Sequence, residues 1–256
     1  MAIKVSDYIA EFLAAHGVQQ IFSVVGGGAM HLNDSLGHHD ALSTIYHHHE
    51  QAAAMAAECY TRLHGEMAVL CVTSGPGALN AISGVVGAYQ DSIPMIVLSG
   101  QAKSTLCIAG CGGKIRTIGG QEADVVSAVR HNMTKNAVML MDPTRVRYEL
   151  EKAFFLAQEG RPGPCWIDIP LDVQGMYVEE ADLEGYAQPE PEGRTDVRTA
   201  VQKVLAQLKK AERPVLYAGN GIRLSGGMQV FKRLCQVLRI PVVTCWGSID
   251  LIGTDD

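Results

Sequence analysis

Short apolar runs alternate along the chain with segments in which apolar residues recur every three or four positions. The first such segment, Val5 to His16, places Ile9, Phe12 and Leu13 on one side and is predicted to be an amphipathic helix. The apolar runs predicted to be strands are residues 20–25, 43–46, 67–72, 95–98, 137–140 and 164–169. Because strands and helices alternate, we predict an α/β fold in which a parallel sheet is covered by helices on both faces.

Helix starts and stops support this pattern. An alanine-rich segment follows Glu50; it has high helix propensity and little side-chain bulk, and it is predicted to end at Gly65. Asp142 and Pro143 predict the start of a later helix, with aspartate at the N-cap and proline at the first position, and Gly160 predicts its end.

The pattern changes between Asp172 and Arg194, where acidic residues and two prolines predict an exposed linker. Beyond it, apolar residues at helical spacing precede two further strands, residues 215–218 and 241–245. We therefore predict three parts: a first domain over residues 1–172, a linker over 173–194 and the beginning of a second α/β domain over 195–256. The second domain is expected to be incomplete within these residues.

Two glycine-containing turns follow strands of the predicted sheet. Gly26–Gly28 follows the first strand, and Thr73–Gly77 follows the third. In a parallel sheet such turns meet at the edge formed by the carboxyl ends of the strands, where ligands bind. We therefore expect Glu50, Pro76 and Asn80 to lie at that edge.

Glu50 is the carboxylate on which the functional prediction depends. It stands in the first turn of a predicted helix, where the helix N-terminus stabilises the anion while burial favours the neutral acid. Glutamates held between these two influences often transfer protons. On this stretch alone, the simpler interpretation is favoured: an ordinary N-terminal glutamate that stabilises its helix.

Composition excludes several classes of function. The 256 residues carry a formal net charge of -6 and no dense run of lysine or arginine, which argues against a nucleic-acid surface. No apolar run reaches the roughly 18 residues of a membrane span, so we predict no membrane segment. The seven cysteines are scattered without zinc-like spacing, which predicts reduced thiols and a cytoplasmic protein. A small-molecule ligand fits this composition best.

An ordered set of motifs carries a resemblance to a known family. The set consists of Gly26–Gly28, His49–Ala57, Thr73–Asn80, Asp91–Pro94, Gly100–Gln101, Gln121–Glu122 and Gly160–Pro164. In this order the motifs resemble thiamine-diphosphate-dependent enzymes of the acetolactate synthase type. The resemblance covers residues 4 to about 172 as the pyrimidine-binding domain and residues 195–256 as the start of the central domain.

The resemblance implies a role for each matched residue. The Glu50 carboxyl would hydrogen-bond the aminopyrimidine ring of the cofactor and favour the tautomer that removes the thiazolium C2 proton, so that a 2-oxo acid such as pyruvate loses carbon dioxide. Glu50 and Gln121 would be catalytic, and Gly27, Pro76 and Asn80 would join Glu50 in binding the cofactor. From the residues alone other roles stay open: Pro76 fits a turn, Asn80 a helix start, and Gln121 an exposed position.

Cofactors and partners also follow from the resemblance. Thiamine diphosphate is held through Mg²⁺ by a Gly-Asp-Gly motif in another domain, and this sequence contains no such motif. We therefore assign no metal ligands here and expect the 256 residues alone to be inactive. Family members build each active site from two chains, which implies a homodimer or homotetramer. Some relatives carry FAD in the central domain, and Gly219–Gly221 makes FAD a further candidate cofactor, although its spacing is not a dinucleotide fingerprint.

Three departures from the family pattern keep the substrate open. Acetolactate synthases usually have a proline where this chain has Val25 and a phenylalanine where it has Gly120, and the loop before Gln121 is longer. These differences leave room for another 2-oxo acid, as in sugar or surface-polysaccharide metabolism. The sequence also leaves open whether the reaction is a ligation or a simple decarboxylation. His31 either faces the site or lies on a helix surface.

The resulting prediction is the N-terminal part of a thiamine-diphosphate-dependent carboligase or decarboxylase acting on a 2-oxo acid. The alternative is a non-catalytic module of the same fold with a regulatory or structural role. The presence of Glu50 argues against that alternative.

Overall fold

The computed structural model describes residues 2–108, 123–190 and 196–253. The chain divides into two compact units, Met1–Gln188 and Pro189–Asp256. The first unit carries the residues expected at the functional site.

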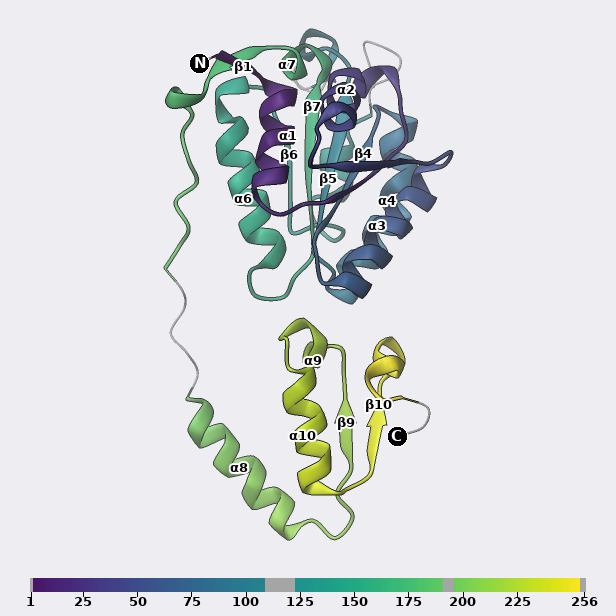
Figure 1. Ribbon diagram of the computed structural model, residues 1–256, viewed down its shortest axis with the longest axis vertical. Helices are drawn as coiled ribbons and strands as arrows, with labels where there is room; N and C mark the ends of the chain where they lie inside the picture. Colours follow the sequence, from purple (N-terminus) through teal and green to yellow (C-terminus); the bar gives the residue numbers. More distant parts are fainter. Residues whose placement is uncertain (1, 109–122, 191–195, 254–256) are drawn as a thin grey trace. The chain divides into compact units, whose positions relative to one another are not determined.

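A six-stranded parallel sheet forms the centre of the first unit (Figure 1). Its strands, in spatial order, are β3 (Ser43–Tyr46), β2 (Gln20–Ser23), β4 (Ala68–Val72), β5 (Met95–Gln101), β7 (Pro164–Pro170) and β6 (Asn136–Met139). Every residue of β4, β5 and β7 is buried, as expected for continuous apolar runs at the centre of a parallel sheet. The six predicted strands and the α/β fold class are confirmed.

Helices cover both faces of this sheet (Figure 1). The helices of the first unit are α1 (Val5–Ala15), α2 (Met30–His38), α3 (Glu50–His64), α4 (Pro76–Asp91), α5 (Val125–Val129), α6 (Val146–Gln158) and the short α7 (Leu171–Gln174). Side chains alternate along β4, so that Val69 and Cys71 join an apolar cluster with α1, α2 and α6, while Leu70 and Val72 join a second cluster with α3, α4 and α5. The predicted two-sided cover is therefore confirmed.

The predicted helix boundaries have clear physical causes. Gly65 follows α3 with φ 75°, a left-handed conformation that suits glycine. The Asp142 side chain accepts a hydrogen bond from the Thr144 N–H at 3.0 Å and caps the turn η4 (Pro143–Arg145) that leads into α6. Small residues bring α3 and α4 together, since a Cβ on Gly84 would lie only 2.5 Å from the Ala54 Cβ.

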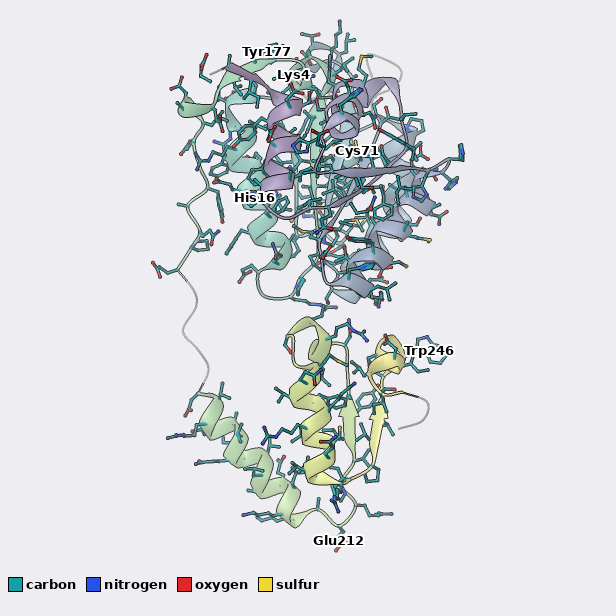
Figure 2. All side chains as sticks on the ribbon, viewed as in Figure 1. Lys4, His16, Cys71, Tyr177, Glu212 and Trp246 are labelled. Atoms are coloured by element: carbon teal, nitrogen blue, oxygen red, sulfur yellow. The ribbon has the colours of Figure 1, made fainter. Side chains whose placement is uncertain are left out.

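The first unit extends beyond the predicted domain of residues 1–172. β1 (Ala2–Lys4) and β8 (Tyr177–Glu179) form an antiparallel pair in which Lys4 lies opposite Tyr177 (Figure 2). The turn η5 (Glu180–Asp182) follows, and Val173, Val178 and Leu183 are buried in the first cluster. Much of the expected linker, residues 173–194, therefore packs within the first unit, while Glu179, Glu180 and Asp182 are exposed.

The second unit is small. Its elements are α8 (Val197–Lys210), β9 (Leu216–Ala218), α9 (Gly221–Leu224), α10 (Met228–Leu238), β10 (Val242–Thr244) and the turn η6 (Trp246–Leu251). β9 and β10 are parallel, and Ala218, Phe231 and Leu251 form its buried core. Trp246 is 94% exposed and points away from this core (Figure 2).

The glycine-rich segment 101–120, predicted to be a long loop, is only partly described. It begins inside β5 and continues through the turn η2 (Ser104–Leu106). Residues 109–122 lie outside the described part of the chain. Among the helices of that part, none combines the length and apolarity that a membrane crossing requires.

Buried cysteines give a first testable consequence of this fold. Burial raises the pKa of Cys71 and of Cys165 to about 12. Because the thiolate is the reactive form, we expect neither thiol to be alkylated in the folded protein at about pH 8. Cys59 is exposed on α3 and should be alkylated before either of them, although desolvation and Glu58 raise its pKa. Peptide mapping by mass spectrometry checks this; labelling of Cys71 as fast as Cys59 without denaturant would contradict it.

Candidate active site

The candidate site lies where the order of strands reverses. From β2 the chain passes to the edge strand β3, whereas β4 pairs with the other side of β2 and leads on to β5. The helices that follow β2 and β4 therefore pack on different faces, α2 in the first cluster and α4 in the second. The region beyond the carboxyl ends of two strands at such a reversal is the usual ligand site of parallel α/β sheets.

The Thr73 side chain contacts both glycine turns beyond the carboxyl ends of β2 and β4. Its hydroxyl accepts a hydrogen bond from the Gly28 N–H at 3.1 Å. A Cβ on Gly26 would lie 2.4 Å from the Thr73 Cβ, and one on Gly77 would lie 2.7 Å from its methyl carbon. Only glycine at these two positions lets both turns close on the threonine side chain. Thr73 stands in the sequence motif Thr73–Asn80, but its role was not predicted, because that role depends on the pairing of β2 with β4.

The backbone is exposed at Gly27, whereas Gly28 is held by hydrogen bonds to side chains. Gly27 is exposed, and a Cβ there would meet no atom within 4 Å. The Gly28 carbonyl accepts a hydrogen bond from the Gln174 Nε2 at 2.8 Å, and a Cβ on Gly28 would lie 2.6 Å from the Ser74 hydroxyl. The turn is thus fixed at Gly28 and open at Gly27. Gln174 lies in the segment expected to be a linker, so sequence reasoning missed it.

Glu50 and Asn80 meet at the N-terminal ends of two helices. Glu50 is the first residue of α3, and Asn80 is the fifth residue of α4. The Asn80 Nδ2 donates to the Glu50 Oε2 at 2.6 Å and lies 3.4 Å from the His49 Nε2. Glu50 is half-buried and Asn80 is exposed. A neutral amide thus orients a carboxylate that also stands at a helix N-terminus, where negative charge is stabilised.

The second carboxylate oxygen and Pro76 complete this group. A Cβ on Gly77 would lie 3.4 Å from the Glu50 Oε1, so the carboxylate lies over a glycine backbone. Pro76 is the first residue of α4 and follows Gly75, whose φ of 58° suits glycine. Pro76 thus starts its helix in the way its sequence position indicates, and its ring is exposed.

The other residues considered from the sequence have different placements. Gln121 lies outside the described residues. His31, in the first turn of α2, is half-buried against Gly175, because a Cβ on that glycine would lie 3.1 Å from the His31 Nε2. In the part of the chain that the structure covers, no three His, Cys, Asp or Glu side chains gather closely enough to hold a metal ion.

Two family models match the chain. One describes the N-terminal binding domain of thiamine pyrophosphate enzymes and matches residues 3–116, and the other describes the central domain of these enzymes and matches residues 201–256. The chain belongs to the thiamine pyrophosphate enzyme family. The resemblance predicted from the ordered motifs is confirmed.

Curated relatives of this chain include acetolactate synthases. The acetolactate synthase large subunit of Lactococcus lactis subsp. lactis is 35% identical over 242 residues, which cover 93% of this chain and 40% of the relative. That of Buchnera aphidicola is 35% identical over 259 residues, covering 98% and 43%. Acetolactate synthase 2, chloroplastic, of Zea mays is 33% identical over 258 residues, covering 99% and 38%. The chain thus spans about 40% of the length of these curated relatives.

Proposed function

We propose that this chain forms the pyrimidine-binding part of a thiamine-diphosphate-dependent carboligase or decarboxylase that acts on a 2-oxo acid. The observation that carries the proposal is the 2.6 Å hydrogen bond from Asn80 to Glu50, near the reversal of strand order at β2 and β4. It occurs in a segment that matches the binding domain of thiamine pyrophosphate enzymes. The residues that would act on the cofactor are thus already oriented within one chain.

The described residues fit the aminopyrimidine part of thiamine diphosphate. The ring is flat, and Gly27 offers a bare backbone with open space beside it. When protonated, the Glu50 carboxyl would donate a hydrogen bond to a ring nitrogen. Pro76 is exposed at the start of α4 and would contact the ring from there. Bound there, thiamine diphosphate supplies the thiazolium that takes up the electron pair left when carbon dioxide departs.

Glu50 would hold the proton that is exchanged with a ring nitrogen of the bound cofactor. Asn80 donates to one carboxylate oxygen and fixes the orientation of the group, which leaves the oxygen over Gly77 free to exchange the proton. The Asn80 amide carries no charge and orients Glu50 by hydrogen bonding alone. Gln121 is proposed, from the sequence alone, to face the reacting centre.

Mg²⁺ and a second chain belong to the same proposal. The ligands for Mg²⁺ would come from another region of the complete protein, and two chains would form a homodimer or homotetramer. FAD is proposed for Gly219–Gly221, which here connects β9 to α9, and the absorption spectrum of the complete protein tests it. The cytoplasmic location rests on the cysteine content alone, since the relative from Zea mays is named as chloroplastic.

The test is carbon dioxide release by the full-length gene product with thiamine diphosphate and Mg²⁺. Pyruvate is assayed first, followed by a panel of other 2-oxo acids with and without an aldehyde acceptor. Release that requires thiamine diphosphate supports the proposal, and its dependence on the acceptor separates ligation from simple decarboxylation. If no 2-oxo acid of the panel releases carbon dioxide and calorimetry detects no binding of thiamine diphosphate, the non-catalytic module is favoured.

Asn80→Asp tests the orientation of Glu50. The variant places a second carboxylate against Glu50 where the wild type has a donor at 2.6 Å. Two such carboxylates cannot both be ionised, so they share a proton to higher pH than either would alone. We expect kcat/KM to fall by about 10- to 100-fold near neutral pH and its pH profile to move. Gln90→Glu, which adds a charge at the exposed far end of α4, is the matched control and should leave the profile unchanged.

A further inference from the structure

A buried polar network crosses two central strands below the candidate site. Asp168 on β7 has no exposed surface although it carries a carboxylate. The Ser99 hydroxyl donates to its Oδ1, and the Gln101 Nε2 donates to its Oδ2 at 2.9 Å. The Trp166 Nε1 donates in turn to the Ser99 Oγ at 2.8 Å. A buried carboxylate destabilises a fold unless donors form hydrogen bonds to it, so the positions of the Ser99 and Gln101 side chains are tightly constrained.

Gln101 connects the network to the backbone at both ends of the segment 102–123. Its Oε1 accepts a hydrogen bond from the Ala102 N–H at 2.9 Å. Its Nε2 donates to the Ala123 carbonyl at 3.1 Å as well as to Asp168. The fully buried Gln101 side chain, at the end of β5, thus forms hydrogen bonds to the backbone at Ala102 and at Ala123, on either side of the segment.

A second carboxylate holds the same segment near its start. The Ser104 N–H donates to the Asp172 Oδ1 at 2.8 Å, and the Ser104 hydroxyl donates to the Oδ2. Partial burial opposes ionisation of Asp172, but the hydrogen bonds from Ser104 outweigh it and lower the pKa of the carboxyl. Both anchors, Asp168 and Asp172, come from β7 and the residues just after it.

We propose that Gln101 and Asp168 are positioning residues for the reaction. Asp168 orients the Gln101 amide, and the amide fixes Ala123 at the carboxyl end of β5. The residue before Gln101, Gly100, packs directly against the Gly28 backbone of the candidate site, so this end of β5 supports that turn. Both side chains are fully buried, so they act through the backbone that Gln101 holds. The catalytic consequence rests on the proposed function, whereas the anchor itself does not.

The anchor is tested by hydrogen exchange in the chain itself. Gln101→Met keeps the length and bulk of the side chain and removes its hydrogen bonds to Ala102, Ala123 and Asp168. Ser99→Ala is the matched control, because it removes a hydroxyl from the same network and leaves the bonds of Gln101 to the backbone. In peptides over residues 102–108 and 123–129 we expect about tenfold faster exchange in Gln101→Met than in Ser99→Ala. Equal exchange in the two variants overturns the proposal.

The double variant Gln101→Glu/Asp168→Asn serves if Gln101→Met does not fold. It exchanges amide and carboxylate, so the two side chains still pair and Glu at position 101 still accepts from Ala102. It has no donor for the Ala123 carbonyl. We expect faster exchange in residues 123–129 alone, and unchanged exchange there counts against the anchor.

Kinetics test the positioning role in the full-length gene product. We expect Gln101→Met to lower kcat by about 10- to 100-fold while KM for the 2-oxo acid and the affinity for thiamine diphosphate change little, since neither residue touches a ligand. Ser99→Ala, which leaves the bonds of Gln101 to Ala102 and Ala123 in place, should lower kcat less than Gln101→Met does. A kcat lowered equally in both variants overturns the positioning role. If the wild type acts on no 2-oxo acid, the proposed function fails, and the exchange comparison still decides whether Gln101 anchors the segment.

Discussion

Glu50→Gln is expected to lower carbon dioxide release from the 2-oxo acid by about 100- to 10,000-fold, the range lost when a general acid–base group is removed. Glutamine keeps the shape of the side chain, and its carbonyl oxygen still accepts from the Asn80 amide. It has no carboxyl proton to exchange with the ring nitrogen. The measurement is steady-state release with saturating thiamine diphosphate, with cofactor affinity determined separately by calorimetry.

Glu58→Gln is the matched control for this prediction. Glu58 lies on the same helix, α3, but pairs with Arg62 rather than with Asn80. We expect its activity to stay within about twofold of the wild type, because it removes a carboxylate that takes no part in proton exchange. Similar losses in both variants would mean that damage to α3, rather than loss of the Glu50 acid, stops the reaction.

Gly100→Ala is expected to have the largest effect on stability. A Cβ at this position in β5 would lie 2.1 Å from the Gly28 carbonyl oxygen and 2.6 Å from the Ala29 nitrogen, and neither backbone atom is able to rotate away. The turn also cannot shift freely, because Thr73 and Gln174 both hold Gly28. We expect the free energy of unfolding to fall by about 3 kcal/mol or more, at the upper end of overpacking effects. Urea denaturation of the chain measures this.

Gly27→Ala is the matched substitution in the adjoining turn. Its Cβ would meet no atom within 4 Å, so we expect a change of less than about 1 kcal/mol in the free energy of unfolding. If the cofactor lies against this bare backbone, its affinity falls although stability does not. A Gly100→Ala variant as stable as Gly27→Ala would contradict the close approach of β5 to the turn.

Local signals account for the parts of the fold that the sequence predicted. Buried strands such as β4 are continuous apolar runs, and α3 ends at a glycine that adopts a left-handed conformation. The pair β1–β8 was missed because each strand has only three residues, too few to show a periodic pattern. In β8 only Val178 faces the core between exposed Tyr177 and Glu179, so the acidic composition favoured a linker.

The candidate site divides in the same way. Glu50 and Asn80 stand in sequence motifs, and the strand order then places them side by side. Thr73, Gln101 and Gln174 have roles only because strands distant in sequence become neighbours. Each of these roles is a hydrogen bond to a backbone atom between 22 and 146 residues away or, for Gln101, also to a carboxylate on another strand. Spacing along one chain carries no signal for such contacts.

The pairing of β1 with β8 places the start of the first unit beside a strand of its C-terminal part, Tyr177–Glu179. A unit of this kind tolerates rearrangement of its gene, because joining its ends requires only a short peptide and opening it elsewhere leaves the sheet order unchanged. A circular permutant with new ends at the exposed residues Asp40 and Ala41, between α2 and β3, would keep every strand of the six-stranded sheet intact.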